Sequence, residues 1–99
     1  MLKDMLVKQI ILEKGCALGL CFQMQAYPLL VLRAEKGFLM CGYLDTRAAE
    51  RLVDAAAKVT GVKTFEDMLK AKIVEATPAA RALGVEPGMT GEEALNKMF

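Results

Sequence analysis

Three cysteines, Cys16, Cys21 and Cys41, are the side chains of this 99-residue chain best suited to chemistry. Cys41 stands in the stretch EKGFLMCGYLD, between an apolar run and a glycine and just before a segment with helical spacing. A thiol at such a junction can be a nucleophile or a redox centre, because a helix N-terminus lowers a thiol pKa without help from histidine. Cysteine is also among the residues most often buried as inert packing. Both interpretations of Cys41 stay open, and packing is the simpler one.

Two neighbours of Cys41 complete the candidate site. Gly42 has no side chain, so a ligand or another backbone can come close to the thiol. Asp45 stands where the next helix is expected to begin, and its carboxylate opposes a thiolate unless it is engaged as the helix cap. We therefore predict Cys41 as the catalytic candidate, and Gly42 and Asp45 as ligand-binding candidates.

The residue types that are missing exclude several kinds of chemistry. The chain has no histidine, no serine and no tryptophan, which excludes Ser–His catalysis, Cys–His catalysis and a zinc site built on imidazole within the chain. The cysteines are odd in number and lack CxxC spacing, so we expect reduced thiols and no disulfide framework. Cys16 and Cys21 would point to opposite faces of one strand, which argues against a shared metal. We predict no metal and no cofactor.

Charge and hydropathy limit the partners. The net charge is +1 and the charged residues alternate in sign, so no basic surface for nucleic acid is expected. No apolar run approaches the roughly 18–20 residues that span a bilayer, and we predict a cytoplasmic protein without membrane contact. Hydrophobic residues make up 55% of the chain, above the roughly 45–50% of an average soluble protein. Part of this apolar surface is expected between subunits, and a homotetramer is the prediction.

The first part of the chain has the pattern of an antiparallel β-meander with four strands. The expected strands cover Met5–Glu13, Cys16–Ala26, Leu29–Ala34 and Phe38–Tyr43. In the second strand the even positions, among them Leu18, Leu20 and Phe22, are apolar, and the odd positions are small or polar. This alternation predicts that the even positions face the core.

After Leu44 the apolar period changes from two to about 3.6, which predicts a longer helix from Asp45 or Thr46 to Gly61. A short helix capped by Thr64, a short strand within 72–76, and C-terminal helices capped by Thr77 and Thr90 are expected to follow. The predicted fold class is therefore α+β in a single domain over 1–99. Residues 1–43 are mainly β and form the expected oligomerisation region, and residues 44–99 are mainly α.

Three stretches together resemble a known family. GFLMCGYLD, GVKTFEDML and GVEPGMTGEEAL are similar to the YunC-like proteins, the domain of unknown function numbered 1805, and the resemblance runs from Leu29 onward. It implies a small α+β domain whose N-terminal β region mediates tetramerisation. It implies no reaction, because the family has no assigned activity, and no catalytic residue can be transferred from it.

Two function classes remain open. The first is a homo-oligomeric protein, structural or binding a small molecule, in which the Cys41 region lines a small pocket near a subunit interface. The alternative is a small enzyme that uses Cys41 as nucleophile or redox thiol, against which the missing internal base counts. Whether the chain is an enzyme is left undecided by the residues, and dependence of activity on one thiol would separate the two classes.

Overall fold

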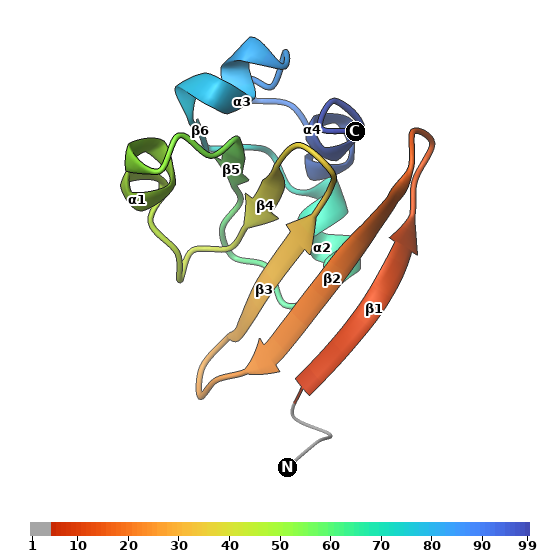
Figure 1. Cartoon of the computed structure of the whole chain (residues 1–99). Helices are drawn as coiled ribbons and strands as arrows, with labels where there is room; N and C mark the ends of the chain where they lie inside the picture. The colour runs from red at the N-terminus through yellow and green to blue at the C-terminus, as the bar shows by residue number, and fades with distance from the viewer. Residues whose placement is uncertain (1–4) are drawn as a thin grey trace.

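The computed structural model describes residues 5–99, which form one sheet of six strands with four short helices (Figure 1). The strands are β1 (Met5–Ile11), β2 (Cys16–Gln23), β3 (Pro28–Arg33), β4 (Phe38–Met40), β5 (Ala56–Lys58) and β6 (Glu75–Ala76). The helices are α1 (Thr46–Arg51), α2 (Phe65–Lys70), α3 (Pro78–Ala82) and α4 (Gly91–Asn96). The α+β prediction is confirmed. Residues 1–4 of the predicted domain lie outside the described residues.

The strands lie side by side in chain order. Strands β1 to β4 form antiparallel neighbours, as the meander prediction requires, although β4 is shorter than expected. The sheet then continues beyond the prediction, because β5 pairs with β4 in parallel and β6 pairs with β5 antiparallel. The sheet is therefore mixed, and β4–α1–β5 is a parallel crossover unit inside it.

The prediction of one longer helix up to Gly61 is wrong. Helix α1 ends at Arg51, and two residues later Val53 takes a φ of 62°. The next residues leave the helical path, and 56–58 pair with β4. The alanines and valine of this stretch fit both a helical and an extended period, so spacing alone misled the prediction. The amide of Val59, which donates to the Met40 carbonyl at 3.0 Å, belongs to the strand pairing that decides the conformation.

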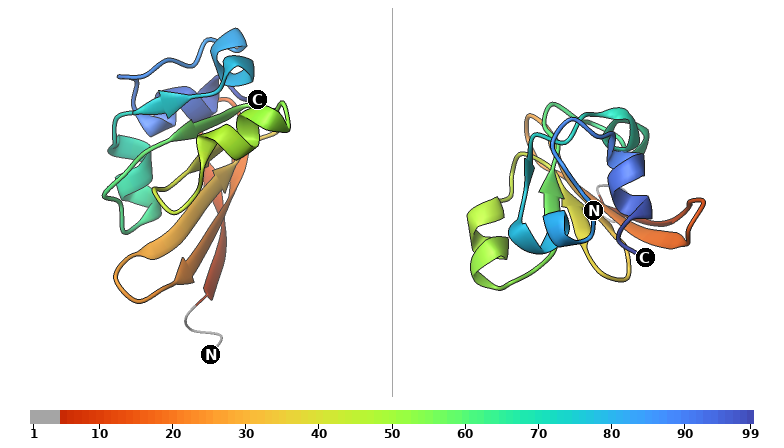
Figure 2. Two further views of the ribbon diagram at one scale, coloured as in Figure 1. Left: turned by 90° about the vertical axis from the view of Figure 1, so that its left-hand side faces the viewer. Right: turned by 90° about the horizontal axis from the view of Figure 1, so that it is seen from above.

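Two helical layers cover different parts of the sheet. On one face, side chains of α2, α3 and α4 build the main core together with Leu30, Leu32 and Leu39 from the middle strands. On the opposite face α1 covers only the region of β4 and β5, where Ala49 packs against Met40 and Ala56. Strands β1 to β3 extend well beyond the helices (Figure 2).

The predicted core face of β2 is also wrong. Ala17 and Cys21 on its odd positions are buried, whereas Leu18, Leu20 and Phe22 on its even positions are exposed. The reason lies in α2, whose Phe65 ring sits so close to Gly19 that a Cβ there would come within 2.9 Å of it. The helices therefore pack against the small-residue face. The large apolar face is left open.

The caps expected from the sequence are present. Thr64, Thr77 and Thr90 each accept a hydrogen bond from an amide in the first turn of α2, α3 and α4. The strand expected within 72–76 is reduced to the two residues of β6. These caps fix where the C-terminal helices begin, and so place Phe65, Met68 and Leu95 over the sheet.

Candidate functional site

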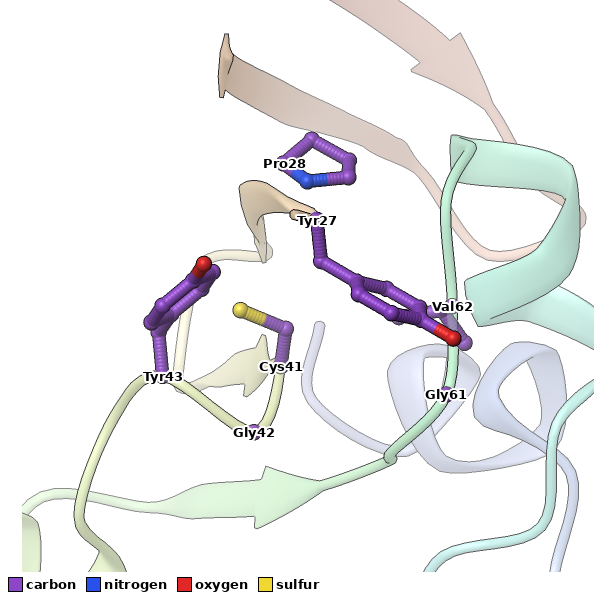
Figure 3. A pocket seen from close by; sticks show the side chains of 7 residues that line it. All are labelled: Tyr27, Pro28, Cys41, Gly42, Tyr43, Gly61 and Val62. Carbon is purple, nitrogen blue, oxygen red and sulfur yellow. The ribbon is translucent and has the colours of Figure 1, made fainter. Parts of the chain in front are cut away.

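A pocket lies where the two parallel strands end. The carboxyl ends of β4 and β5 lie side by side at one end of the sheet, and the segments that follow the two strands come together there. The pocket between them has a volume of about 240 Å³. It is lined by Tyr27, Pro28, Cys41, Gly42, Tyr43, Gly61 and Val62 (Figure 3). The crevice beyond the carboxyl ends of parallel strands is where open α/β sheets bind their ligands.

Cys41 forms the floor of this pocket. Its backbone continues the pairing of β4 with β3, because its amide donates to the Leu30 carbonyl at 3.2 Å. The Leu30 amide in turn donates to the Cys41 sulfur at 3.3 Å. The residue is 3% exposed, so the thiol is nearly enclosed and yet borders a cavity.

Two tyrosines stand on either side of the sulfur. Figure 3 shows the Cys41 side chain between the rings of Tyr27 and Tyr43, which come from the β2–β3 turn and from the segment after β4. The tyrosines are 43% and 48% exposed, so much of each side chain is open to solvent at the pocket. The Lys63 ammonium lies 5.2 Å from the centre of the Tyr27 ring and brings a positive charge to this edge of the site.

The two glycines of the pocket differ in whether their backbone conformation requires a glycine. Gly61 has a φ of +70°, a backbone conformation that other residues rarely adopt. Gly42 has no such requirement, and a Cβ added there would only touch Thr60 Cγ2 at an ordinary 3.7 Å. The fold of the chain does not require a glycine at position 42. The space left by the missing side chain is therefore available to a ligand.

Asp45 lies outside the pocket lining. Its carboxylate caps α1 by accepting the Arg47 amide at 2.9 Å, and it also approaches the Arg47 guanidinium at 3.8 Å. The hydrogen bond from the Arg47 amide, helped by the charge of the Arg47 side chain, holds the pKa of Asp45 below its ordinary value. Asp45 therefore positions α1, and the structure does not bring it together with Cys41 and Gly42 at the cavity.

The other thiols lie elsewhere. Cys16 is exposed and Cys21 is buried, as expected for side chains on opposite faces of β2, and all three cysteines are free. Burial raises the pKa of the Cys21 thiol, which weakens it as a nucleophile. Within residues 5–99, no three thiol or carboxylate groups gather as a metal site would require. Across the same residues, none of the helices is long and apolar enough to cross a bilayer.

Sequence reasoning found Cys41 and Gly42 but missed most of the pocket. Tyr27, Tyr43, Gly61 and Val62 are spread over 36 positions of the sequence, and the spacing predicts a helix where β5 forms. A usable signal was present at Gly61, where a glycine follows a short apolar stretch and can mark the end of a strand as well as of a helix.

The chain is similar to proteins whose function is itself unassigned. It matches the family described as a domain of unknown function (DUF1805) over residues 40–98. It is 40% identical over 69 residues to the uncharacterized protein YunC of Bacillus subtilis, a match that covers 66% of this chain and 68% of that protein. A crystal structure of a protein of unknown function, TA1206 from Thermoplasma acidophilum, is similar with a TM-score of 0.91 and 34% identity, over 96% of this chain and 93% of that one. The YunC-like resemblance is confirmed, and the chain belongs to the DUF1805 family.

Proposed function

We propose that this protein is a homo-oligomer that binds a small molecule in the pocket around Cys41. The observation that supports binding is the position of the pocket, at the carboxyl ends of β4 and β5 with Cys41 at its floor. Its volume of about 240 Å³ lies below the roughly 300–1,000 Å³ of sites for drug-sized ligands. A compact metabolite is therefore the expected size of ligand.

The lining suggests how the ligand is held. Val62 and Pro28 are buried and apolar, and the two tyrosine rings give flat walls that end in hydroxyl groups. Such a surface favours a molecule with an apolar, flat body and few polar groups. Gly42 lets that body lie against the backbone beside the thiol.

The apolar open face of β1 to β3 supports association with further copies of this chain. Strand register places Leu20, Val31 and Met40 on one face, but α1 covers that face only as far as Met40. Exposed apolar residues on the uncovered part, each between 36% and 78% exposed, are Met5, Val7, Ile11, Leu18, Leu20 and Phe22. An exposed apolar face of this kind, with Arg33 as its charged residue within these strands, marks an association surface.

The free edge of β1 offers a second surface. It is a seven-residue strand at the end of the sheet, and such an edge pairs with another chain unless it is protected. One two-fold contact through this edge and another through the open face would generate a four-subunit assembly with dihedral symmetry. We therefore infer a homotetramer built by the N-terminal strands.

Light scattering on the purified protein tests the assembly. A mass of four subunits at micromolar concentration is expected. A stable monomer at that concentration would refute the proposal, and a dimer would leave one of the two surfaces unused and refute the tetramer.

A thermal-shift screen of metabolites tests the binding. A ligand that raises the melting temperature of the natural protein should lose most of its effect on Tyr43→Ala, because this variant removes one wall of the pocket. Leu52→Ala is the matched control, since Leu52 is exposed and does not line the pocket. Equal shifts in the two variants would show that the ligand binds elsewhere.

The alternative function is that of an enzyme with Cys41 as nucleophile or redox thiol. The hydrogen bond from the Leu30 amide to the sulfur favours it. Iodoacetamide labelling of a Cys16→Ala, Cys21→Ala background isolates this thiol. Labelling of the folded protein well below pH 8 would support the enzyme, whereas a thiol that reacts only after unfolding would exclude it.

The proposal also includes the cellular location and the partners of the protein. A cytoplasmic location is supported by three free thiols, one of them exposed. The near-neutral net charge argues against nucleic acid and against an anionic membrane surface as partners.

A further inference from the structure

Among the residues that line the pocket, two consecutive pairs of backbone amides, besides the amide of Tyr27, have no hydrogen-bond partner in the part of the chain from 5 to 99. They belong to Gly42, Tyr43, Gly61 and Val62, which are two consecutive pairs in the segments that follow β4 and β5. Pairing stops at these residues and at Thr60 before Gly61, and it resumes at Leu44 and Lys63. The amide of Cys41 donates to a carbonyl, and that of Lys63 donates to the Asp67 carboxylate at 3.1 Å.

The amide of Val62 calls for an acceptor, whereas Gly42, Tyr43 and Gly61 are exposed residues whose amides water can also reach. Backbone N–H groups are strong donors that folded proteins almost always satisfy, and Val62 is a buried residue, 4% exposed. Successive free amides in a turn also form concave sites that bind anions. All four residues line one small cavity.

The nearby charges agree with a negative ligand group. The exposed Lys63 ammonium lies over the ring of Tyr27, which itself lines the pocket. The carboxylates closest along the chain are already engaged, because Asp45 accepts from Arg47 and Asp67 accepts from the Lys63 amide. Neither carboxylate is among the residues that line the cavity.

We propose that the ligand of this pocket is a small carboxylate with a flat, apolar body. The free amides and Lys63 receive the carboxylate, and the body lies between the two tyrosine rings over Cys41. This inference rests on the proposed binding function and adds the chemical class of the ligand. A bare phosphate ion fits less well, because it has nothing to place against the apolar walls formed by Pro28 and Val62.

The test uses three ring compounds of nearly equal shape and different charge. Benzoate, benzamide and benzylamine are titrated into the isotope-labelled full-length protein, and the amide resonances are followed by NMR. Inorganic phosphate is a fourth probe. We expect benzoate to move the resonances of Gly42, Tyr43, Gly61 and Val62, and to bind about tenfold more tightly than benzamide, since hydrogen bonds to a charged acceptor are the stronger ones.

A charge-removing variant sharpens the result. Lys63→Gln should weaken benzoate about threefold or more and leave benzamide within about twofold, because only the anion uses the lysine charge. Lys70→Gln is the matched control, an exposed lysine that does not line the pocket, and should change neither affinity.

The outcomes separate this inference from the proposed function. If benzamide or benzylamine moves the same resonances with equal or higher affinity than benzoate, the carboxylate class is wrong and small-molecule binding stands. If phosphate displaces benzoate and binds with higher affinity, the carboxylate class is likewise wrong, and the proposal of an anion site stands. If none of the probes binds and the metabolite screen finds no ligand, both proposals fail.

Discussion

The two halves of the chain differ in whether their large apolar side chains are buried or exposed. Strands β1 and β2 hold large residues such as Leu20 and Phe22 on an exposed face and bury small ones such as Ala17. From β4 onward the large residues Met40, Met68 and Leu95 are buried almost completely. The half from β4 onward packs its large side chains inside the chain, whereas β1 and β2 leave theirs exposed.

Because of this difference, most of the pocket belongs to one half of the chain and the exposed apolar face belongs to the other. The half from β4 onward contributes Cys41, Gly42, Gly61 and Val62 to the pocket, and its strand order and caps hold these residues together. The N-terminal strands add Tyr27 and Pro28 to the pocket rim, next to the region proposed for association. The proposed binding and the proposed assembly can therefore be tested separately, and variants in each half should give different kinds of effect.

The largest effect is expected at a close contact of the half from β4 onward. A Cβ at Gly91 would overlap the Met68 carbonyl oxygen, which is backbone and cannot swing aside. Gly91→Ala should therefore lower the free energy of unfolding by about 3 kcal/mol or more, at the upper end of overpacking effects, as measured by chemical denaturation. Gly42→Ala is the control and should cost less than about 0.5 kcal/mol. Equal losses would mean that the contact of Gly91 is not what holds α4 in place.

A smaller loss is expected at Thr77, a residue 2% exposed. Its hydroxyl accepts from the Ala56 amide at 3.0 Å and donates to the Asp54 carbonyl at 2.8 Å, so it ties α3 to β5. Thr77→Val keeps the shape and removes both bonds, together with the capping bond that the hydroxyl accepts from the Ala80 amide at 3.3 Å. The free energy of unfolding should fall by about 1–3 kcal/mol, the cost of buried groups left unpaired. Thr60→Val, at an exposed threonine, should be nearly neutral, and a neutral Thr77→Val would contradict the role of this tie.

On the open face a charge should act on assembly more than on folding. Leu20→Lys places an ammonium in the centre of the exposed apolar residues, where association would bury it without a partner. We expect a lower mass by light scattering and a helical and strand content unchanged by circular dichroism. Leu52→Lys adds the same charge at an exposed leucine outside β1 to β3, at the end of α1, and should keep the natural mass. An unchanged assembly in Leu20→Lys would place the interface elsewhere.

The smallest effect concerns pH and the cap of α4. The hydrogen bond from the Thr90 amide to the Glu93 carboxylate, strengthened by the Thr90 hydroxyl, holds the pKa of Glu93 below its ordinary 4.5. A lowered folded-state pKa means stabilisation that is full above the unfolded value and is lost as pH falls through the folded value. The natural protein should therefore melt slightly above Glu93→Gln at pH 7, and the two should converge below pH 4.5. A difference that persists in acid would assign the effect to packing.

The structure explains which parts could be predicted from the sequence. The caps at Thr64, Thr77 and Thr90 depend on bonds between residues three apart, so the sequence reveals them directly. The hairpins of β1 to β4 also follow from short turns and alternating residues. In contrast, β5 forms only because a strand eighteen residues earlier pairs with it, and no local spacing records that pairing.

The sequence by itself determined the α+β class, the helix starts, the free thiols and the place of Cys41 near the carboxyl end of a strand. Only the tertiary structure decided which face of β2 is buried, because a period of two marks two faces without saying which one meets the helices. It also decided that Tyr27, Cys41 and Gly61 share one cavity. The physical reason is the same in both cases: these properties come from contacts between segments distant in the chain, and such contacts form only when the whole sheet is assembled.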